Sequence, residues 1–275
     1  MDYKVVVTLT TIPSREKHVL KTIQSIKNNT LRPNVIYVNM RKRITRLNAE
    51  FSPGFRDQLI KMGVTINESE DYGSLTKIIP IIKAESDPEA LVITLDDDII
   101  YNQNFIHALV YGFKEFNENN QEPTVIGFSG MTYPETSLKI LGKIDYVIYQ
   151  DHGNTPEILE SGFGLIMKKK WLDRFPKVPI EKSNLKGDEK YLYICDDYIL
   201  SLYFDIINIK KRIIDYPLIG RKGDDFSSYC SFIEEASNNN DSLSNKTTSI
   251  ENYYNGTKII KEFLNAAFPG SNINN

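Results

Sequence analysis

Short apolar, β-branched runs alternate with amphipathic segments along the first half of the chain. Residues 5–10 (VVVTLT) show almost no polar alternation, which is typical of a strand buried on both faces. Similar runs predict four more strands, at residues 35–38, 64–66, 91–95 and 125–128. Apolar residues at helical spacing predict helices at residues 14–26, 55–62, 74–83 and 103–116, and Pro80 should bend the third of these or cap a second turn.

This alternation of strands and helices predicts an α/β fold with a mostly parallel sheet and helices on both faces. In such sheets, ligands bind beyond the carboxyl ends of the strands. The second half is less regular. It predicts strands at 145–149, 157–167 and 212–216, the first two as a candidate pair, and helices at 196–207 and 251–267. Residues 237–249 are polar and of low complexity, so we expect a loop there.

The composition is that of an ordinary globular protein. The 275 residues are 41% hydrophobic and carry a net charge of −3, which excludes fibrous and wholly disordered classes and disfavours a sequence-independent nucleic-acid binder. The apolar run at the N-terminus is too short for a signal peptide, and no stretch approaches the ~18 apolar residues of a membrane span. Cys195 and Cys230 form no CxxC motif. We therefore expect a cytoplasmic protein without a membrane span.

Three consecutive carboxylates follow the predicted strand at 91–95. Asp96, Asp97 and Asp98 repel one another, and a hard divalent ion such as Mn²⁺ or Mg²⁺ would relieve this repulsion. Along an extended segment, Asp96 and Asp98 point to one side and form the candidate metal pair. Asp97 is then free to hydrogen-bond a hydroxyl. The alternative is a solvated acidic turn that caps the next helix.

Residues 91–100 (LVITLDDDII) resemble the strand and DxD motif of GT-A glycosyltransferases, which use nucleotide-sugar donors. Other segments that resemble parts of these enzymes, in matching order and spacing, are residues 5–15, 71–80, 161–166 and 196–201. Residues 5–15 resemble the first strand and nucleotide-binding loop, and residues 71–80 resemble a D-x-G-x-x-TK segment of some bacterial and viral members. Residues 161–166 resemble the glycine-containing acceptor-side segment, and residues 196–201 resemble the acidic pair that supplies the base in inverting enzymes.

The resemblance implies a GT-A (Rossmann-like) fold with a mixed, mostly parallel sheet. It also implies a catalytic domain at residues 1–235, with a nucleotide-sugar-binding half (1–100) and an acceptor-side half (101–235). A polar linker (236–249) and a C-terminal helix and tail (250–275) would follow.

The resemblance also assigns residues to the donor. We expect the nucleotide-sugar to contact Thr10, Thr11, Ile12, Arg15, Asp71, Lys77, Asp97, Gly162, Phe163 and Gly164. The first three would lie near base and ribose, and Arg15 near the base or diphosphate. Lys77 would lie near the phosphates, together with the backbone amides of the predicted helix start at Ser74. The two glycines let the backbone approach a sugar. The alternatives are a surface arginine, a solvated lysine and a β-bulge around a core phenylalanine.

Asp196 and Asp197 begin a predicted amphipathic helix. One of the pair can act as a helix cap, and the other can take the proton of an acceptor hydroxyl in an inverting transfer. By motif position we expect Asp197 to be the base, with Asp196 as the second choice. A retaining enzyme would not need this base.

The sequence departs from the GT-A pattern in one respect. Many members take a further metal ligand from a C-terminal histidine, whereas the three histidines here are His18, His107 and His152. His152 and the pair Asp224–Asp225 are the candidate replacements. Otherwise the triplet and the donor phosphates alone would hold the ion.

The expected function is a metal-dependent, inverting transfer of a sugar, with a UDP-sugar favoured as donor and a glycan or other hydroxyl as acceptor. Oligomeric state, sugar and linkage stay open. Three alternatives remain: a non-catalytic GT-A-like sugar-binding protein, a DxD phosphohydrolase of the haloacid-dehalogenase type, and a sugar-1-phosphate nucleotidyltransferase. The phosphohydrolases carry the motif on their first strand, and the nucleotidyltransferases have a glycine-rich loop that residues 9–15 lack.

Overall fold

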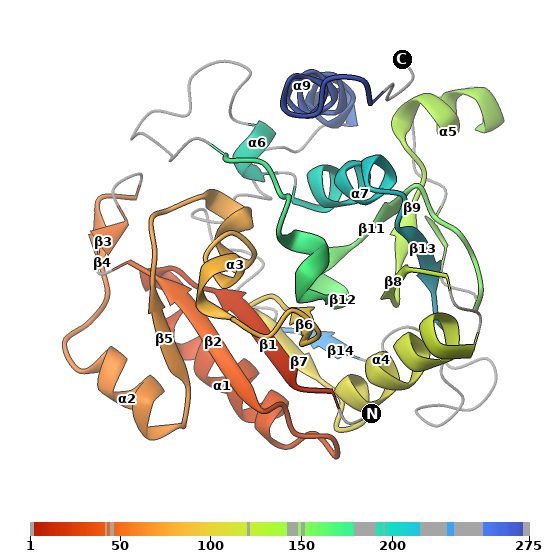
Figure 1. Ribbon diagram of the computed structural model, residues 1–275. Helices are drawn as coiled ribbons and strands as arrows, with labels where there is room; N and C mark the ends of the chain where they lie inside the picture. Colours follow the sequence, from red (N-terminus) through yellow and green to blue (C-terminus); the bar gives the residue numbers. More distant parts are fainter. Residues whose placement is uncertain are drawn as a thin grey trace.

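A seven-stranded sheet in the order β13-β8-β12-β6-β1-β2-β5 forms the centre of the molecule (Figure 1). The computed structural model describes residues 3–41, 43–44, 47–119, 122–141, 148–149, 152–178, 191–194, 196–214, 230–233 and 250–271. The strands of the sheet are β1 Val5–Thr10, β2 Val35–Met40, β5 Thr65–Glu68, β6 Leu91–Thr94, β8 Thr124–Gly127, β12 Leu165–Lys168 and β13 Lys210–Ile213.

One strand of this sheet runs against the other six. Strand β12 is antiparallel to both neighbours, with Leu165 opposite Thr94 of β6 and Gly127 of β8. The pairs β1–β2, β1–β6, β2–β5 and β8–β13 are parallel. Consequently, the residues that precede β12 lie at the edge of the sheet where β6 ends.

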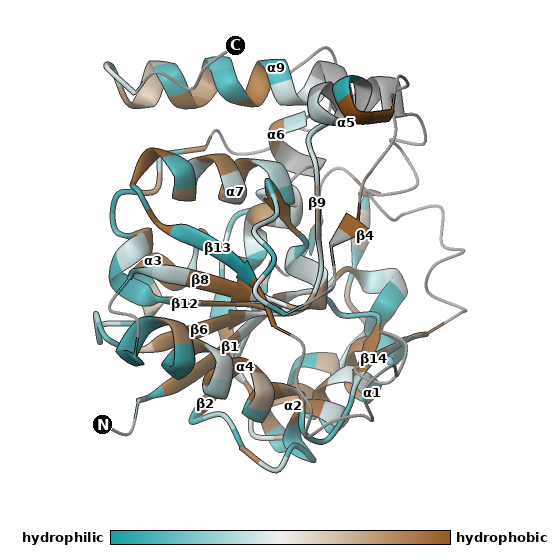
Figure 2. Ribbon diagram, turned by 90° about the vertical axis from the view of Figure 1, so that its right-hand side faces the viewer, coloured by the Kyte–Doolittle hydropathy of each residue, from teal (hydrophilic) through white to brown (hydrophobic). Residues whose placement is uncertain are grey.

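Helices cover both faces of the sheet, which explains the uninterrupted apolar runs. On one face, α1 (Glu16–Lys27), α2 (Phe55–Lys61) and α4 (Phe105–Lys114) pack against Val5, Val7 and Leu9. On the other, α7 (Asp196–Ile206) and α9 (Ile250–Ala267) share a second core with Val6 and Val92. Figure 2 shows the two helix layers above and below the sheet, with α9 outermost. Among the described residues, no helix is both long and apolar enough to cross a membrane.

Shorter elements surround this framework. Three small sheets pair β3 (Arg43–Ile44) with β4 (Ala49–Glu50), β7 (Ile99–Tyr101) with β14 (Cys230–Phe232), and β9 (Gly130–Met131) with β10 (Ile148–Tyr149) and β11 (Ile158–Leu159). The short helices and helical turns are η1 Pro13–Arg15, η3 Gly73–Lys77, α3 Ile81–Ala84, η4 Glu115–Asn119, α5 Pro134–Leu141, η5 Ser161–Phe163, η6 Lys169–Leu172 and α6 Tyr191–Ile194.

The predicted fold class is confirmed: the sheet is mixed and mostly parallel, with helices on both faces. The helix predicted at 74–83 is present in two parts, with Pro80 as the cap of the second. The structure has the 3-10 turn η3, then the short helix α3. Pro80 separates them, because proline lacks the backbone N–H and its ring clashes with the carbonyl of the preceding turn.

Other differences lie in the second half. The strand predicted at 157–167 is divided into β11 and β12 by η5, where Gly164 has a φ of +87°. The candidate pairing of 145–149 with this segment is wrong, because β9 lies between β10 and β11 and pairs with both. The strand predicted at 212–216 begins earlier, at Lys210. Residues 215–216 and the predicted loop at 237–249 lie outside the described residues.

Gly112 of α4 provides a test of this packing. A Cβ atom at this position would lie 2.6 Å from Cγ2 of Ile214. On an open helix surface Gly→Ala stabilises by about 1 kcal/mol. Here we expect G112A to lower the free energy of unfolding by about 1–3 kcal/mol, because the core is overpacked. In an I214A background the same substitution should become neutral or stabilising. Denaturant unfolding of the four proteins measures this, and an equal cost in both backgrounds would contradict the packing.

Candidate active site

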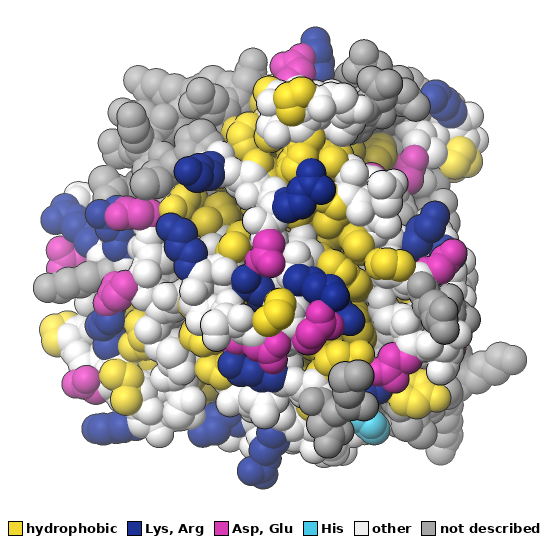
Figure 3. Space-filling view, in the orientation of Figure 1, with side chains coloured by type: hydrophobic (Ala, Val, Ile, Leu, Met, Phe, Trp, Pro, Cys, Tyr) yellow, Lys and Arg dark blue, Asp and Glu magenta, His cyan; other side chains and the backbone are white. Residues whose placement is uncertain are grey.

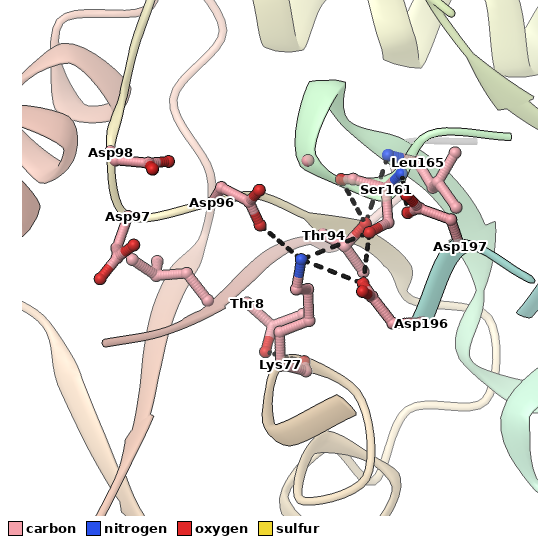
Figure 4. A network of polar contacts seen from close by, with 12 residues as sticks. Thr8, Lys77, Thr94, Asp96, Asp97, Asp98, Ser161, Leu165, Asp196 and Asp197 are labelled. Carbon is pink, nitrogen blue, oxygen red and sulfur yellow. Dashed lines mark hydrogen bonds and ion pairs between the residues drawn. The ribbon is translucent and has the colours of Figure 1, made fainter. Parts of the chain in front are cut away.

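Polar side chains from four segments meet at one edge of the sheet. The acidic triplet Asp96–Asp98 follows β6, and η3 carries Lys77. Because β12 is antiparallel, the preceding turn η5 lies beside the end of β6. The acidic pair Asp196–Asp197 begins α7. Figure 4 shows these groups converging on one polar network.

The triplet forms the turn between β6 and β7. Asp97 is buried, whereas Asp96 and Asp98 are partly exposed, which is the alternation expected from the sequence. The Asp97 carboxylate points away from that of Asp96 (Figure 4). Arg15 donates through Nη1 to Asp97 Oδ1 at 2.6 Å, and its Nη2 lies 3.1 Å from Asp98 Oδ2. Thr22 donates its hydroxyl to the Asp97 carbonyl. Arg15 therefore lies against the triplet as an internal cation.

Repulsion within the triplet remains strong despite Arg15. Burial, followed by the charges of Asp96 and Asp97, raises the pKa of Asp98 to about 7. Additional positive charge at this point would therefore be stabilised. In the described part of the chain, no group of three or more His, Cys, Asp or Glu side chains is arranged as a metal site. The partly exposed carboxylates of Asp96 and Asp98 nevertheless fit a hard divalent ion that takes its remaining ligands from water and phosphate.

Lys77 connects the triplet to the acidic pair. Its ammonium contacts Asp96 Oδ1 and lies 3.1 Å from Asp196 Oδ2 and 3.3 Å from the Ser161 hydroxyl. Only 5% of its side chain is exposed. The prediction placed this ammonium near donor phosphates. In the structure, it is held by two carboxylates.

The two carboxylates at the start of α7 differ in their surroundings. Asp196 accepts hydrogen bonds from the Lys77 ammonium and from the hydroxyls of Ser161 and Ser74, and these interactions lower its pKa against the effect of burial. Asp197 accepts the Ser161 backbone N–H at 2.7 Å. Burial, and then the charge of Asp196, raises the pKa of Asp197 to about 8. The surroundings therefore favour the ionised form of Asp196 and the protonated form of Asp197.

Each glycine of the segment 161–164 lies where a side chain would clash with a neighbouring residue. A Cβ atom on Gly162 would lie 2.3 Å from Asp96 Oδ2, so the absence of a side chain makes room for that carboxylate. Gly164 has a positive φ, and a Cβ there would meet the Phe105 ring at 2.8 Å. Phe163 is partly buried and packs against the core.

The expected base and ribose contacts lie where β1 ends. Thr10 donates its hydroxyl to the Asn39 carbonyl at 2.9 Å. Thr11 is buried, and its hydroxyl has no hydrogen-bond partner among the residues described here. Ile12 precedes η1. Asp71 lies at the start of the η3 turn, where its carboxylate accepts the Gly73 backbone N–H at 3.0 Å.

Ser161 and Tyr101 are residues of the site that were not predicted. Ser161 links both members of the acidic pair, through its backbone N–H and its hydroxyl. The Tyr101 hydroxyl accepts the Asp96 backbone N–H and donates to the Gly162 carbonyl, both at 2.9 Å, and so ties the triplet to η5. An aromatic residue three positions after the triplet gave no local signal of this contact.

In the described part of the chain, none of the candidate additional metal ligands is seen beside the triplet. His152 lies 3.4 Å from Glu115 and beside the Phe116 ring. Asp224 and Asp225 lie outside the described residues, as does Cys195. On the face shown in Figure 3, acidic and basic side chains are interspersed, and the central group contains both signs.

Comparisons with known proteins agree on the fold. No family model matches the sequence, and no curated protein matches it. The structure is similar to S. aureus TarS residues 1–349, solved in complex with UDP-GlcNAc, with a TM-score of 0.56 and 13% identity over 98% of this chain and 74% of that one. It also matches a longer TarS structure with a TM-score of 0.50 and 13% identity, over 98% of this chain and 44% of that one. The chain therefore has a GT-A-like fold.

A third similar structure is glucosyl-3-phosphoglycerate synthase from Mycobacterium tuberculosis, solved with Mn²⁺, UDP and glucosyl-3-phosphoglycerate. Its identity is 16% over 78% of this chain and 74% of that one, with a TM-score of 0.43. This likeness is too distant to support a statement about metal or substrate.

The ion pair between Arg15 and the triplet provides a stability test. The Arg15 side chain is 12% exposed, and removing it would strand the buried Asp97 carboxylate. We expect R15M to lower the free energy of unfolding by about 3–5 kcal/mol. R15M/D97N should recover part of this loss. The control is R56M, because Arg56 is 36% exposed and pairs with an exposed glutamate, a contact expected to contribute under about 1 kcal/mol. Equal losses in R15M and R56M would mean that Arg15 does not stabilise the triplet.

Proposed function

We propose that this chain is a metal-dependent glycosyltransferase. It would move a sugar from a nucleoside-diphosphate donor, with a UDP-sugar favoured, to the hydroxyl of a glycan or other acceptor, with inversion at the anomeric carbon. The observation that carries the proposal is the network at the sheet edge. An acidic triplet suited to a cation and a carboxyl suited to proton transfer are held together through Lys77 and Ser161.

The charge of the site supports a cation as cofactor. Among the residues that the structure describes, the five aspartates at 96–98 and 196–197 pair with two cations, Lys77 and Arg15. An anionic diphosphate would be repelled by the excess negative charge. In this proposal Asp96 and Asp98 would hold Mn²⁺ or Mg²⁺. When bound, the ion would neutralise the charge that develops on the departing diphosphate.

The donor would lie across residues 1–100, the nucleotide-sugar-binding half. Thr10, Thr11 and Ile12 would border base and ribose, and the Thr11 hydroxyl has no hydrogen-bond partner among the described residues. Asp71 would shape the turn that leads to Lys77, and Arg15 would orient Asp97 and Asp98. Gly162, Phe163 and Gly164 would face the sugar from the acceptor-side half, residues 101–235.

Asp197 would act as the general base. Its carboxylate would take the proton of the acceptor hydroxyl as that oxygen attacks the anomeric carbon, while the bond to the diphosphate breaks on the opposite face. With a pKa of about 8, Asp197 is a stronger base than an ordinary carboxylate once it is deprotonated. Asp196 would stay ionised beside it.

The donor site is tested by calorimetric titration of UDP and GDP with and without Mn²⁺. We expect one of the two nucleotides to bind, and only when the metal is present. D98A should weaken this binding more than about 100-fold, because a residue that binds the metal directly should matter at least as much as one that only orients a metal ligand. The matched control is D173A, since Asp173 pairs with Lys169 on the surface. Unchanged binding in D98A would remove the triplet from the metal role.

The base is tested by following UDP release from UDP-sugars, beginning with UDP-GlcNAc, the donor that TarS binds. We expect D197N to keep the Mn²⁺–UDP affinity and to lower kcat by about 10²–10⁴-fold. In the wild type, kcat/KM should increase with pH up to about pH 8, because the active form of Asp197 is the deprotonated one.

Two other outcomes would point to different functions. Nucleotide binding without turnover of any donor would favour the non-catalytic sugar-binding protein. Hydrolysis of simple phosphomonoesters without nucleotide binding would favour the phosphohydrolase.

A further inference from the structure

Lys77 has a fixed position between the two acidic groups. Its backbone carbonyl accepts the hydroxyl of Thr8, a buried residue of β1, at 2.6 Å. Its side chain then extends to Asp96 on one side and to Asp196 and Ser161 on the other (Figure 4). A buried ammonium with two carboxylate partners has a defined geometry, in contrast to a solvated lysine on a helix surface.

The contacts of the acidic pair are unequal because of Lys77. Asp196 accepts the ammonium, whereas Asp197 accepts a neutral backbone N–H from Ser161. A charge-assisted hydrogen bond favours the ionised form of its acceptor more than a neutral donor does. Negative charge is therefore held on Asp196, and the proton of the pair is held on Asp197.

We propose that Lys77 is a positioning residue: it fixes the negative charge on Asp196, leaves Asp197 as the group that accepts a proton, and sets the distance between this pair and Asp96. This inference rests on the proposed function. It gives Lys77 a role different from a contact to donor phosphates, and it distinguishes the two aspartates by their partners.

The charges around Asp197 determine what substitution should do. Among the described residues, the charged groups with the largest effect on Asp197 are Asp196 and Glu160, which are negative, and Lys77, which is positive. Without Lys77, Asp197 would hold its proton more tightly. Without the charge of Asp196, Asp197 would hold its proton less tightly. The two substitutions should therefore shift the titration of Asp197 in opposite directions.

The experiment compares K77M, D196N and K77M/D196N with the wild type. The carboxyl resonance of Asp197 is followed by ¹³C NMR in protein labelled at aspartate and is assigned by its loss in D197N. The pH profile of UDP release and the Mn²⁺–UDP affinity are measured in parallel. The matched control is K211M, because the Lys211 side chain is also 5% exposed and pairs with Asp205, away from the network.

We expect the Asp197 titration to move to higher pH in K77M, to lower pH in D196N, and to stay in place in K211M. Each pH unit of upward shift should lower the rate of UDP release at pH 7 about tenfold. K77R, which keeps the positive charge, should restore part of the profile.

The double variant keeps the test valid if K77M does not fold. It removes the ammonium without stranding the Asp196 charge, and its Asp197 should titrate at higher pH than in D196N alone. Unchanged titration of Asp197 in both K77M and the double variant, relative to their parents, would overturn the inference. Failure of the proposed function would appear separately, as a wild type that binds no nucleotide with or without metal.

Discussion

Repulsion among buried carboxylates is the constraint on which the site depends. Five aspartates lie at one edge of the sheet, and two buried cations keep them in place. Arg15 reaches the triplet from the turn after β1, and Lys77 reaches both acidic groups from the turn after β5. Because each cation has at least two carboxylate partners, moving one segment would strand charge in another. The local turns and the sheet are therefore coupled through electrostatics.

Much of the fold could be predicted from local patterns. The apolar runs that became β1, β6 and β8 are buried on both faces, and this leaves a clear signal in the sequence. The acidic triplet was predicted to follow a buried strand, and it does. The acidic pair was predicted at the start of a helix, and α7 begins there. In each case the evidence lay within a few consecutive residues.

The contacts across the site could not be predicted in this way. A four-residue strand such as β12 carries no sign of its direction, yet its antiparallel course brings Ser161 and Gly162 beside Asp96. The glycine motif indicated a close approach, and the approaching group in the structure is a carboxylate of the same chain. Lys77 was predicted to lie near phosphates and Arg15 near the base or the diphosphate. Their carboxylate partners in the structure come from distant segments, which the local sequence does not indicate. Local sequence indicates that a cation is present, whereas the topology decides what it binds.

The distribution of the two cations explains why chemically identical aspartates differ. Within the acidic pair, the Lys77 ammonium contacts Asp196 and not Asp197, which favours the ionised form of Asp196, whereas burial and the charge of Asp196 raise the pKa of Asp197 to about 8. A second cation at the pair would ionise both groups and weaken the base. Without any cation, two buried carboxylates would repel each other with no fixed arrangement. The number and placement of cations thus separate a structural carboxylate from one that can exchange a proton.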